Sequence, residues 1–84
     1  MNQKQIAKCL DIEYKMYQDY PEGLNAKDGL VEFAKRIAKP FNGLSDIDLV
    51  LLGDYFRTGQ QVLRNRGLIE RRGSKRGDGY KLVQ

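Results

Sequence analysis

Six polar side chains within residues 57–65 are of the types that hydrogen-bond to the edges of nucleic acid bases. Arginine pairs with guanine, and glutamine or asparagine pairs with adenine. The six are Arg57, Thr58, Gln60, Gln61, Arg64 and Asn65. Val62 and Leu63 lie among them and are expected to face a core. The segment therefore predicts a helix with a base-reading face, and we expect Arg57, just before Thr58, to contact phosphate.

A second basic cluster follows in residues 71–81 and is interleaved with glycines, which let a loop approach phosphates closely. Its members are Arg71, Arg72, Lys75, Arg76 and Lys81. Lys75 or Arg76 is placed to enter a narrow minor groove, where the negative potential is enhanced.

The net positive charge of the chain comes entirely from its last third. The net charge is +4 over 84 residues. Residues 57–84 hold eight Lys and Arg against Glu70 and Asp78, which gives +6, and residues 1–56 hold seven against nine acids, which gives −2. Such asymmetry indicates a polyanionic partner contacted by one end of the molecule.

Composition argues against several kinds of active site. The chain has no His and a single Cys, Cys9, so it cannot form a Ser–His or Cys–His pair, a His-ligated zinc site or an internal disulfide. Asp46, Asp48 and Asp54 are expected to be cap and surface acids rather than metal ligands. We expect no enzymatic activity, no cofactor and no metal, and nothing indicates a small-molecule ligand.

Length and hydropathy predict one small domain over residues 1–84. The longest apolar run is residues 49–52, far short of a membrane span, and the first residues lack the apolar stretch of a signal peptide. We therefore expect a cytoplasmic protein with no membrane contact.

Two helices are expected in the first half. Ile6, Leu10, Tyr14 and Tyr17 share one face of a helix over residues 3–20, which Pro21 ends. A second helix begins after an Asn25 cap, with Asp28 in its first turn and Pro40 at its end.

Two further helices are expected before Gly67. Ser45 caps a helix over residues 45–52, with Leu44 and Leu49 spaced as a hydrophobic staple, and Gly53 ends it. The next helix begins at Asp54 or at Thr58, and the two starts remain open. Its end is predicted at Gly67. Leu63 and Leu68 are spaced to touch across a Schellman cap there.

A β-hairpin is expected after Gly67. Residues 68–72 and 80–83 are typical of strands, and the glycine-rich stretch 73–79 between them predicts a flexible basic tip.

This order of elements resembles the winged helix-turn-helix family over residues 26–83. The matching parts are residues 45–52, Gly53, the helix that ends in residues 62–69 (VLRNRGLI) and a wing over residues 70–83. Residues 76–82 (RGDGYKL) look like the wing of response-regulator effector domains. The resemblance implies an α+β, mostly helical fold. It also implies that the third core helix enters the DNA major groove while the wing touches the flanking backbone or minor groove.

The resemblance leaves residues 1–22 as an added N-terminal helix. Its apolar, Tyr-rich face fits a homodimer interface or packing onto the chain's own core, and we favour the dimer slightly.

The expected function is sequence-specific binding of double-stranded DNA, by a small transcriptional regulator or a phage or mobile-element factor. Two alternatives stay open. One is a winged-helix module or small inhibitor that binds another protein, and the other is a nonspecific nucleic-acid binder.

Overall fold

The structure is a computed structural model that describes residues 3–38 and 46–84. It holds the helices α1 (Gln3–Asp19), α2 (Ala26–Ala38) and α3 (Asp46–Asn65), then the strands β1 (Ile69–Arg71) and β2 (Tyr80–Leu82). A single 3-10 turn, η1 (Arg76–Asp78), lies between the strands. Within the described ranges, no helix is both long and apolar enough to cross a membrane.

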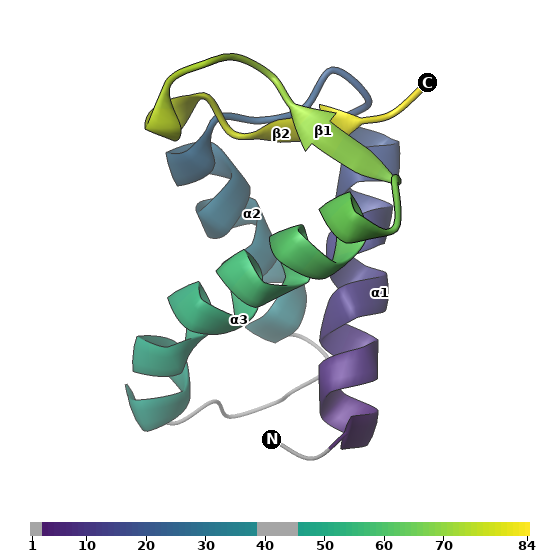
Figure 1. The fold of residues 1–84 in the computed structure, drawn as a ribbon. Coiled ribbons are helices and arrows are strands. Elements are labelled where there is room, and N and C mark those ends of the chain that lie inside the picture. Colours follow the sequence, from purple (N-terminus) through teal and green to yellow (C-terminus); the bar gives the residue numbers. More distant parts are fainter. Residues whose placement is uncertain (1–2, 39–45) are drawn as a thin grey trace.

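The architecture is α+β, with three helices below a two-stranded antiparallel sheet (Figure 1). The register pairs Ile69 with Leu82 and Arg71 with Tyr80. Leu24, in the turn between α1 and α2, forms an isolated antiparallel bridge with Tyr80. The sheet is thereby attached to the helical layer at the start of α2.

The core lies where the three helices and β1 meet. Met16, Phe33, Ile37, Leu63 and Ile69 are almost completely buried. The ring of Phe33 on α2 lies 5.2 Å from that of Phe56 on α3, centroid to centroid. Close aromatic pairs of this kind hold neighbouring helices together.

α1 is part of this core. It packs against α2, α3 and β2, and it contributes the buried side chains of Cys9, Met16 and Tyr17. The expected alternative of packing onto the chain's own core therefore accounts for most of its apolar face. Ile6, which is 47% exposed, and Tyr20 remain at the surface. The helix is integral to the packing of the described residues rather than an addition to it.

The start of α2 is as predicted. The Asn25 Oδ1 atom accepts a hydrogen bond from the Asp28 backbone N–H at 2.8 Å, and the Asn25 Nδ2 atom donates to the Asp28 carboxylate at 3.0 Å. The cap satisfies a backbone N–H that has no partner within the helix. The predicted stop at Pro40 and the cap and staple at Ser45 and Leu44 lie outside the described residues.

The prediction of two helices separated at Gly53 is wrong. α3 is one helix of 20 residues that passes through Gly53 and Gly59, and neither Asp54 nor Thr58 begins a helix. Leu52, Phe56 and Leu63 keep helical spacing across both glycines and are all buried. A glycine in a helix costs about 1 kcal/mol relative to alanine, and burial of one large apolar side chain stabilises by more than that.

The predicted end of this helix at Gly67 is confirmed. Gly67 has a φ of +74°, its N–H donates to the Arg64 carbonyl at 2.9 Å, and the Leu68 N–H donates to the Leu63 carbonyl at 3.0 Å. These two bonds define a Schellman cap, which requires a left-handed residue at this position.

The hairpin is also confirmed, but its tip is bonded rather than loose. The Asp78 carboxylate accepts a hydrogen bond from the Lys75 N–H at 3.0 Å, and the Asp78 N–H donates to the Lys75 carbonyl at 3.1 Å. Arg71 and Arg72 donate to the carbonyls of Lys75 and Asp78. The glycine-rich composition predicts a flexible tip, because it gives no sign of the hydrogen bonds between Lys75 and Asp78.

Candidate nucleic-acid interface

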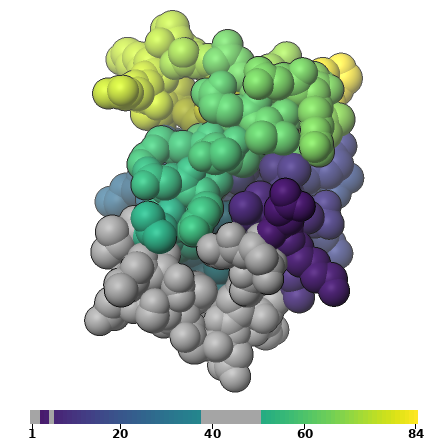
Figure 2. Space-filling view, turned by 60° about the horizontal axis from the view of Figure 1, so that its bottom comes forward, coloured from purple at the N-terminus to yellow at the C-terminus, as the bar shows by residue number. Residues whose placement is uncertain are grey.

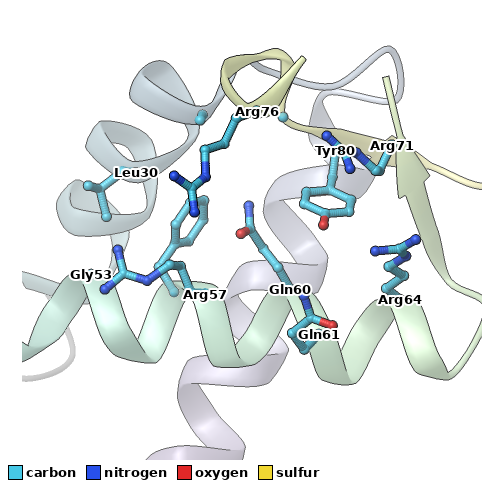
Figure 3. Close-up of a pocket in the computed structure, with 12 residues that line it drawn as sticks. Leu30, Gly53, Arg57, Gln60, Gln61, Arg64, Arg71, Arg76 and Tyr80 are labelled. Atoms are coloured by element: carbon cyan, nitrogen blue, oxygen red, sulfur yellow. The ribbon is translucent and has the colours of Figure 1, made fainter. Parts of the chain in front are cut away.

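A groove lies between α3, the N-terminal part of α2 and the hairpin (Figure 3). Four arginines line it: Arg57 and Arg64 from α3, Arg71 from β1 and Arg76 from η1. Its other lining residues are Ala26, Leu30, Gly53, Phe56, Gln60, Gln61, Gly79 and Tyr80. Guanidinium groups thus border the groove on the helical side and on the hairpin side.

Acidic groups of the described residues neutralise little of this charge. Arg57 pairs with Asp54 on the exposed surface of α3, where such a pair contributes little. Arg64, Arg71 and Arg76 form no ion pair with any residue in the described ranges. By contrast, Arg36 is held by two carboxylates, at 2.8 Å from Asp19 and 3.0 Å from Glu32. Clustered guanidinium groups that form no ion pair with the described residues favour an external anion.

Three of the polar side chains share one exposed face of α3. Arg57, Gln61 and Arg64 are exposed at intervals of three and four residues along α3, so they share one face of the helix. Figure 2 shows the C-terminal half of α3, in green, next to the hairpin, in yellow-green, at one end of the molecule.

The structure brings six of the sequence-predicted residues together around the groove and leaves five outside it. Those that line it are Arg57, Gln60, Gln61, Arg64, Arg71 and Arg76. Those that do not are Thr58, Asn65, Arg72, Lys75 and Lys81. Nearly half of the residues that the sequence predicts as nucleic-acid contacts, on the basis of their type, therefore lie outside the groove.

Thr58 and Lys81 have clear reasons for lying apart. Thr58 borders a separate hollow between α1 and α3, on another side of the helix. Lys81 alternates with the groove-lining Tyr80 along β2, so its side chain leaves the other face of the strand. Its Nζ atom lies 3.7 Å from a Glu70 carboxylate oxygen.

Gln60 lies at the bottom of the groove rather than on its rim. It is only 9% exposed, and its Nε2 atom donates to the Tyr17 hydroxyl at 3.4 Å. The Tyr17 hydroxyl in turn donates to Glu13 Oε2 at 3.1 Å. A buried hydrogen-bonded chain therefore runs from α1 to the groove.

Glu13 is the buried acid at the end of this chain. It is 1% exposed, and its Oε1 atom has no hydrogen-bond partner among the described residues. Burial raises the pKa of Glu13 to about 8, although the hydrogen bond from Tyr17 opposes the shift. The carboxyl is therefore mostly neutral at pH 7. Burial, followed by the proximity of Glu13, also raises the pKa of Tyr17.

Tyr80 is the lining residue that the sequence does not reveal. Its residue type predicts a core or interface filler, and Tyr80 does pack against the core with part of its ring. Yet it is half-buried, and Figure 3 shows its ring in the groove with the hydroxyl directed towards α3. Its pairing with Arg71 across the hairpin is the available signal, because opposed residues of a hairpin share one face.

No group of three or more Cys, Asp or Glu side chains that could hold a metal ion occurs among residues 3–38 and 46–84. The groove offers cationic, amide and aromatic groups, and this combination is suited to binding phosphates and bases.

No protein-family model, no curated protein and no solved structure matches the chain.

Proposed function

We propose that the protein binds double-stranded DNA with sequence preference, through α3 and the hairpin, as a small regulator of transcription. The observation that carries this is the groove itself. Four arginines from three elements converge on it, and three of them form no ion pair among the described residues. The exposed amide of Gln61 lies among these arginines. Arginine and glutamine together provide phosphate contacts and base-edge contacts.

The order of elements supports the proposal. A helix, a bridging residue at Leu24, two further helices and a hairpin follow one another. This is consistent with a winged helix-turn-helix in which α1, α2 and α3 are the three core helices. In that assignment α3 is the reading helix and the hairpin is the wing. The assignment differs from the one based on sequence, which places the core in residues 26–83.

Salt dependence tests the electrostatic part. Four neutralised phosphates would give a slope of about −4 in a plot of log affinity against log salt concentration, at about 0.9 per phosphate. We expect this slope for duplex DNA, measured by fluorescence anisotropy. A slope shallower than about −2 would instead favour the alternative of a protein-binding module.

Sequence preference needs a second measurement. Selection from random duplex DNA should yield a preferred site, on which Gln61→Ala loses about 1–3 kcal/mol of binding free energy and relaxes the preference at one base pair. A selection that returns no preferred site would favour the nonspecific binder.

A matched pair of charge variants locates the contact on the hairpin. Arg76→Gln removes one positive charge from the groove, and Lys81→Gln removes one from the other face of β2. We expect Arg76→Gln to weaken binding of all duplexes and Lys81→Gln to have a much smaller effect. Equal losses would mean that only net charge matters and that the groove is not the contact surface.

A further inference from the structure

The bottom of the groove has a different chemistry from its rim. The rim carries guanidinium groups, whereas the bottom carries the aromatic rings of Phe56 and Tyr80 and the amide of Gln60. The groove spans about 690 Å³, within the range of roughly 300–1,000 Å³ that is typical of small-molecule sites. An apolar bottom beneath a charged rim suits a ligand with a flat ring at one end and a negative charge at the other.

The buried chain determines which atom of Gln60 faces a ligand. The Tyr17 hydroxyl donates its hydrogen to Glu13, so its oxygen accepts from Gln60 Nε2. The Gln60 Oε1 atom accepts no hydrogen bond from any residue in the described ranges. It is therefore available to accept a hydrogen bond from a ligand in the groove.

Tyr80 supplies the surface for a ring. Its side chain lies between the amide of Gln60 and the rim, and its strand neighbour across the hairpin is the rim residue Arg71. Nucleobases stack on exposed tyrosine rings with little regard to sequence. A base on Tyr80 would place its attached phosphate towards the guanidinium groups of Arg71 and Arg76.

We propose that the groove is a binding site for a single nucleotide whose base carries an exocyclic amino group. The base stacks on Tyr80 and donates its amino hydrogen to Gln60 Oε1, and the arginines bind the phosphate. The nucleotide is either free or an unpaired residue of a DNA strand. This site does not depend on duplex binding, although it shares the arginines.

The experiment compares two deoxynucleotides whose bases differ in the group at position 6 and, as a consequence, in whether N1 carries a hydrogen. dAMP has an amino group where dIMP has a carbonyl oxygen, and the two share size and phosphate. We expect dAMP to bind at least fivefold more tightly than dIMP, measured by isothermal titration calorimetry. Inorganic phosphate, which lacks a base, should bind more weakly than either.

Two variants separate the roles of the bottom residues. Gln60→Leu should abolish the preference for dAMP over dIMP. Tyr17→Phe should reduce it while Gln60 is still present, because the amide loses the partner that orients it. Thermal melting identifies any variant that is not folded. Tyr80→Leu, which removes the ring, should weaken dAMP and dIMP alike, whereas Lys81→Gln, on the other face of β2, should bind dAMP as the wild type does.

The source of the nucleotide is decided by comparing dAMP with a six-residue single strand of deoxyadenosine. Similar affinity for both identifies a free nucleotide, and binding of the strand alone identifies an unpaired residue. Equal binding of dAMP, dIMP and phosphate would overturn the proposal, as would the absence of binding by both dAMP and the strand. The affinity of Gln60→Leu for duplex DNA is measured in parallel. An unchanged duplex affinity would show that the nucleotide site and duplex binding are independent of each other.

Discussion

The two sides of α3 face opposite electrostatic environments. The side towards α1 closes over one carboxyl, Glu13, which is almost fully buried and has an oxygen without a hydrogen-bond partner. The side towards the hairpin opens onto four arginines. A charge costs much free energy in the first environment and little in the second, because water solvates only the second.

Because of this difference, we expect stability and binding to depend on different sides of the same helix. Substitutions on the α1 side should change the free energy of unfolding, and substitutions on the hairpin side should change affinity for an anion. Gly59 and Arg64 illustrate the two sides. A Cβ atom at Gly59 would overlap Glu13 Oε1, whereas Arg64 is exposed and borders the groove.

The largest expected effect is a loss of stability with rising pH. The pKa of Glu13 is about 8 in the folded protein against an ordinary 4.5, so the folded state binds more protons between these values. The free energy of unfolding should therefore fall by roughly 1.4 kcal/mol for each pH unit between about pH 5 and pH 8. Urea denaturation at a series of pH values measures this. Glu13→Gln should remove the slope, and an identical slope in that variant would show that another group is responsible.

A smaller loss is expected from Gly59→Ala. The added methyl group must displace the Glu13 carboxyl, and overpacking of this kind costs about 1–3 kcal/mol despite the better helix propensity of alanine. Gly53→Ala is the matched control on the same helix. Its Cβ atom would meet only the Arg57 guanidinium at an ordinary 3.5 Å, so it should stabilise by up to about 1 kcal/mol. If both variants shifted the melting temperature in the same direction, the close contact between α1 and α3 would be in doubt.

The C-terminal end of α3 lies on neither of these two sides. A substitution there should change the free energy of unfolding through the backbone conformation alone. Gly67 has a φ of +74°, and a Cβ atom added there would meet no other atom within 4 Å. Gly67→Ala should therefore cost about 1 kcal/mol of conformational strain, without a steric clash. Gly67→Val, with a branched Cβ, should cost more. Thermal melting checks both, and an unchanged midpoint would place the end of the helix elsewhere.

The smallest effect on stability is expected on the hairpin side. Arg64→Ala should change the free energy of unfolding by less than about 0.5 kcal/mol, because the side chain is exposed and forms no ion pair with the described residues. The same variant should weaken duplex binding by about 1–3 kcal/mol. A large drop in melting temperature would mean that the two sides of α3 are not independent.

Local signals in the sequence are sufficient for features that depend on few residues. The cap at Asn25 and the end of α3 at Gly67 each depend on residues within about five positions of one another, as hydrogen bonds of helix ends do. The two strands of the hairpin are separated by a short glycine-rich stretch that marks the turn. The spacing of residue types along the chain therefore predicts all three.

Features that depend on contacts between distant residues are not predictable in this way. The sequence indicates a helix end at Gly53, because it does not show that Leu52, Phe56 and Leu63 are buried along one continuous helix. Nor does it show that Glu13 occupies the space beside Gly59. Gln60 has the residue type of a base-reading side chain, and only the position of Tyr17, 43 residues away, shows that it lies at the bottom of the groove.

The bridge between Leu24 and Tyr80 has a consequence for the kinetics of association. Gly79 packs so closely on the Leu24 carbonyl that no side chain would fit there, and this holds β2 to the start of α2. Together with the bonded turn at Asp78, the bridge resists a hinge motion of the hairpin relative to α3. The spacing between the backbone segments that carry the arginines of the two walls is therefore set by the fold itself. An anion that bound there would cost little backbone entropy, and its rate of encounter should depend on diffusion and long-range attraction rather than on the ordering of a loop.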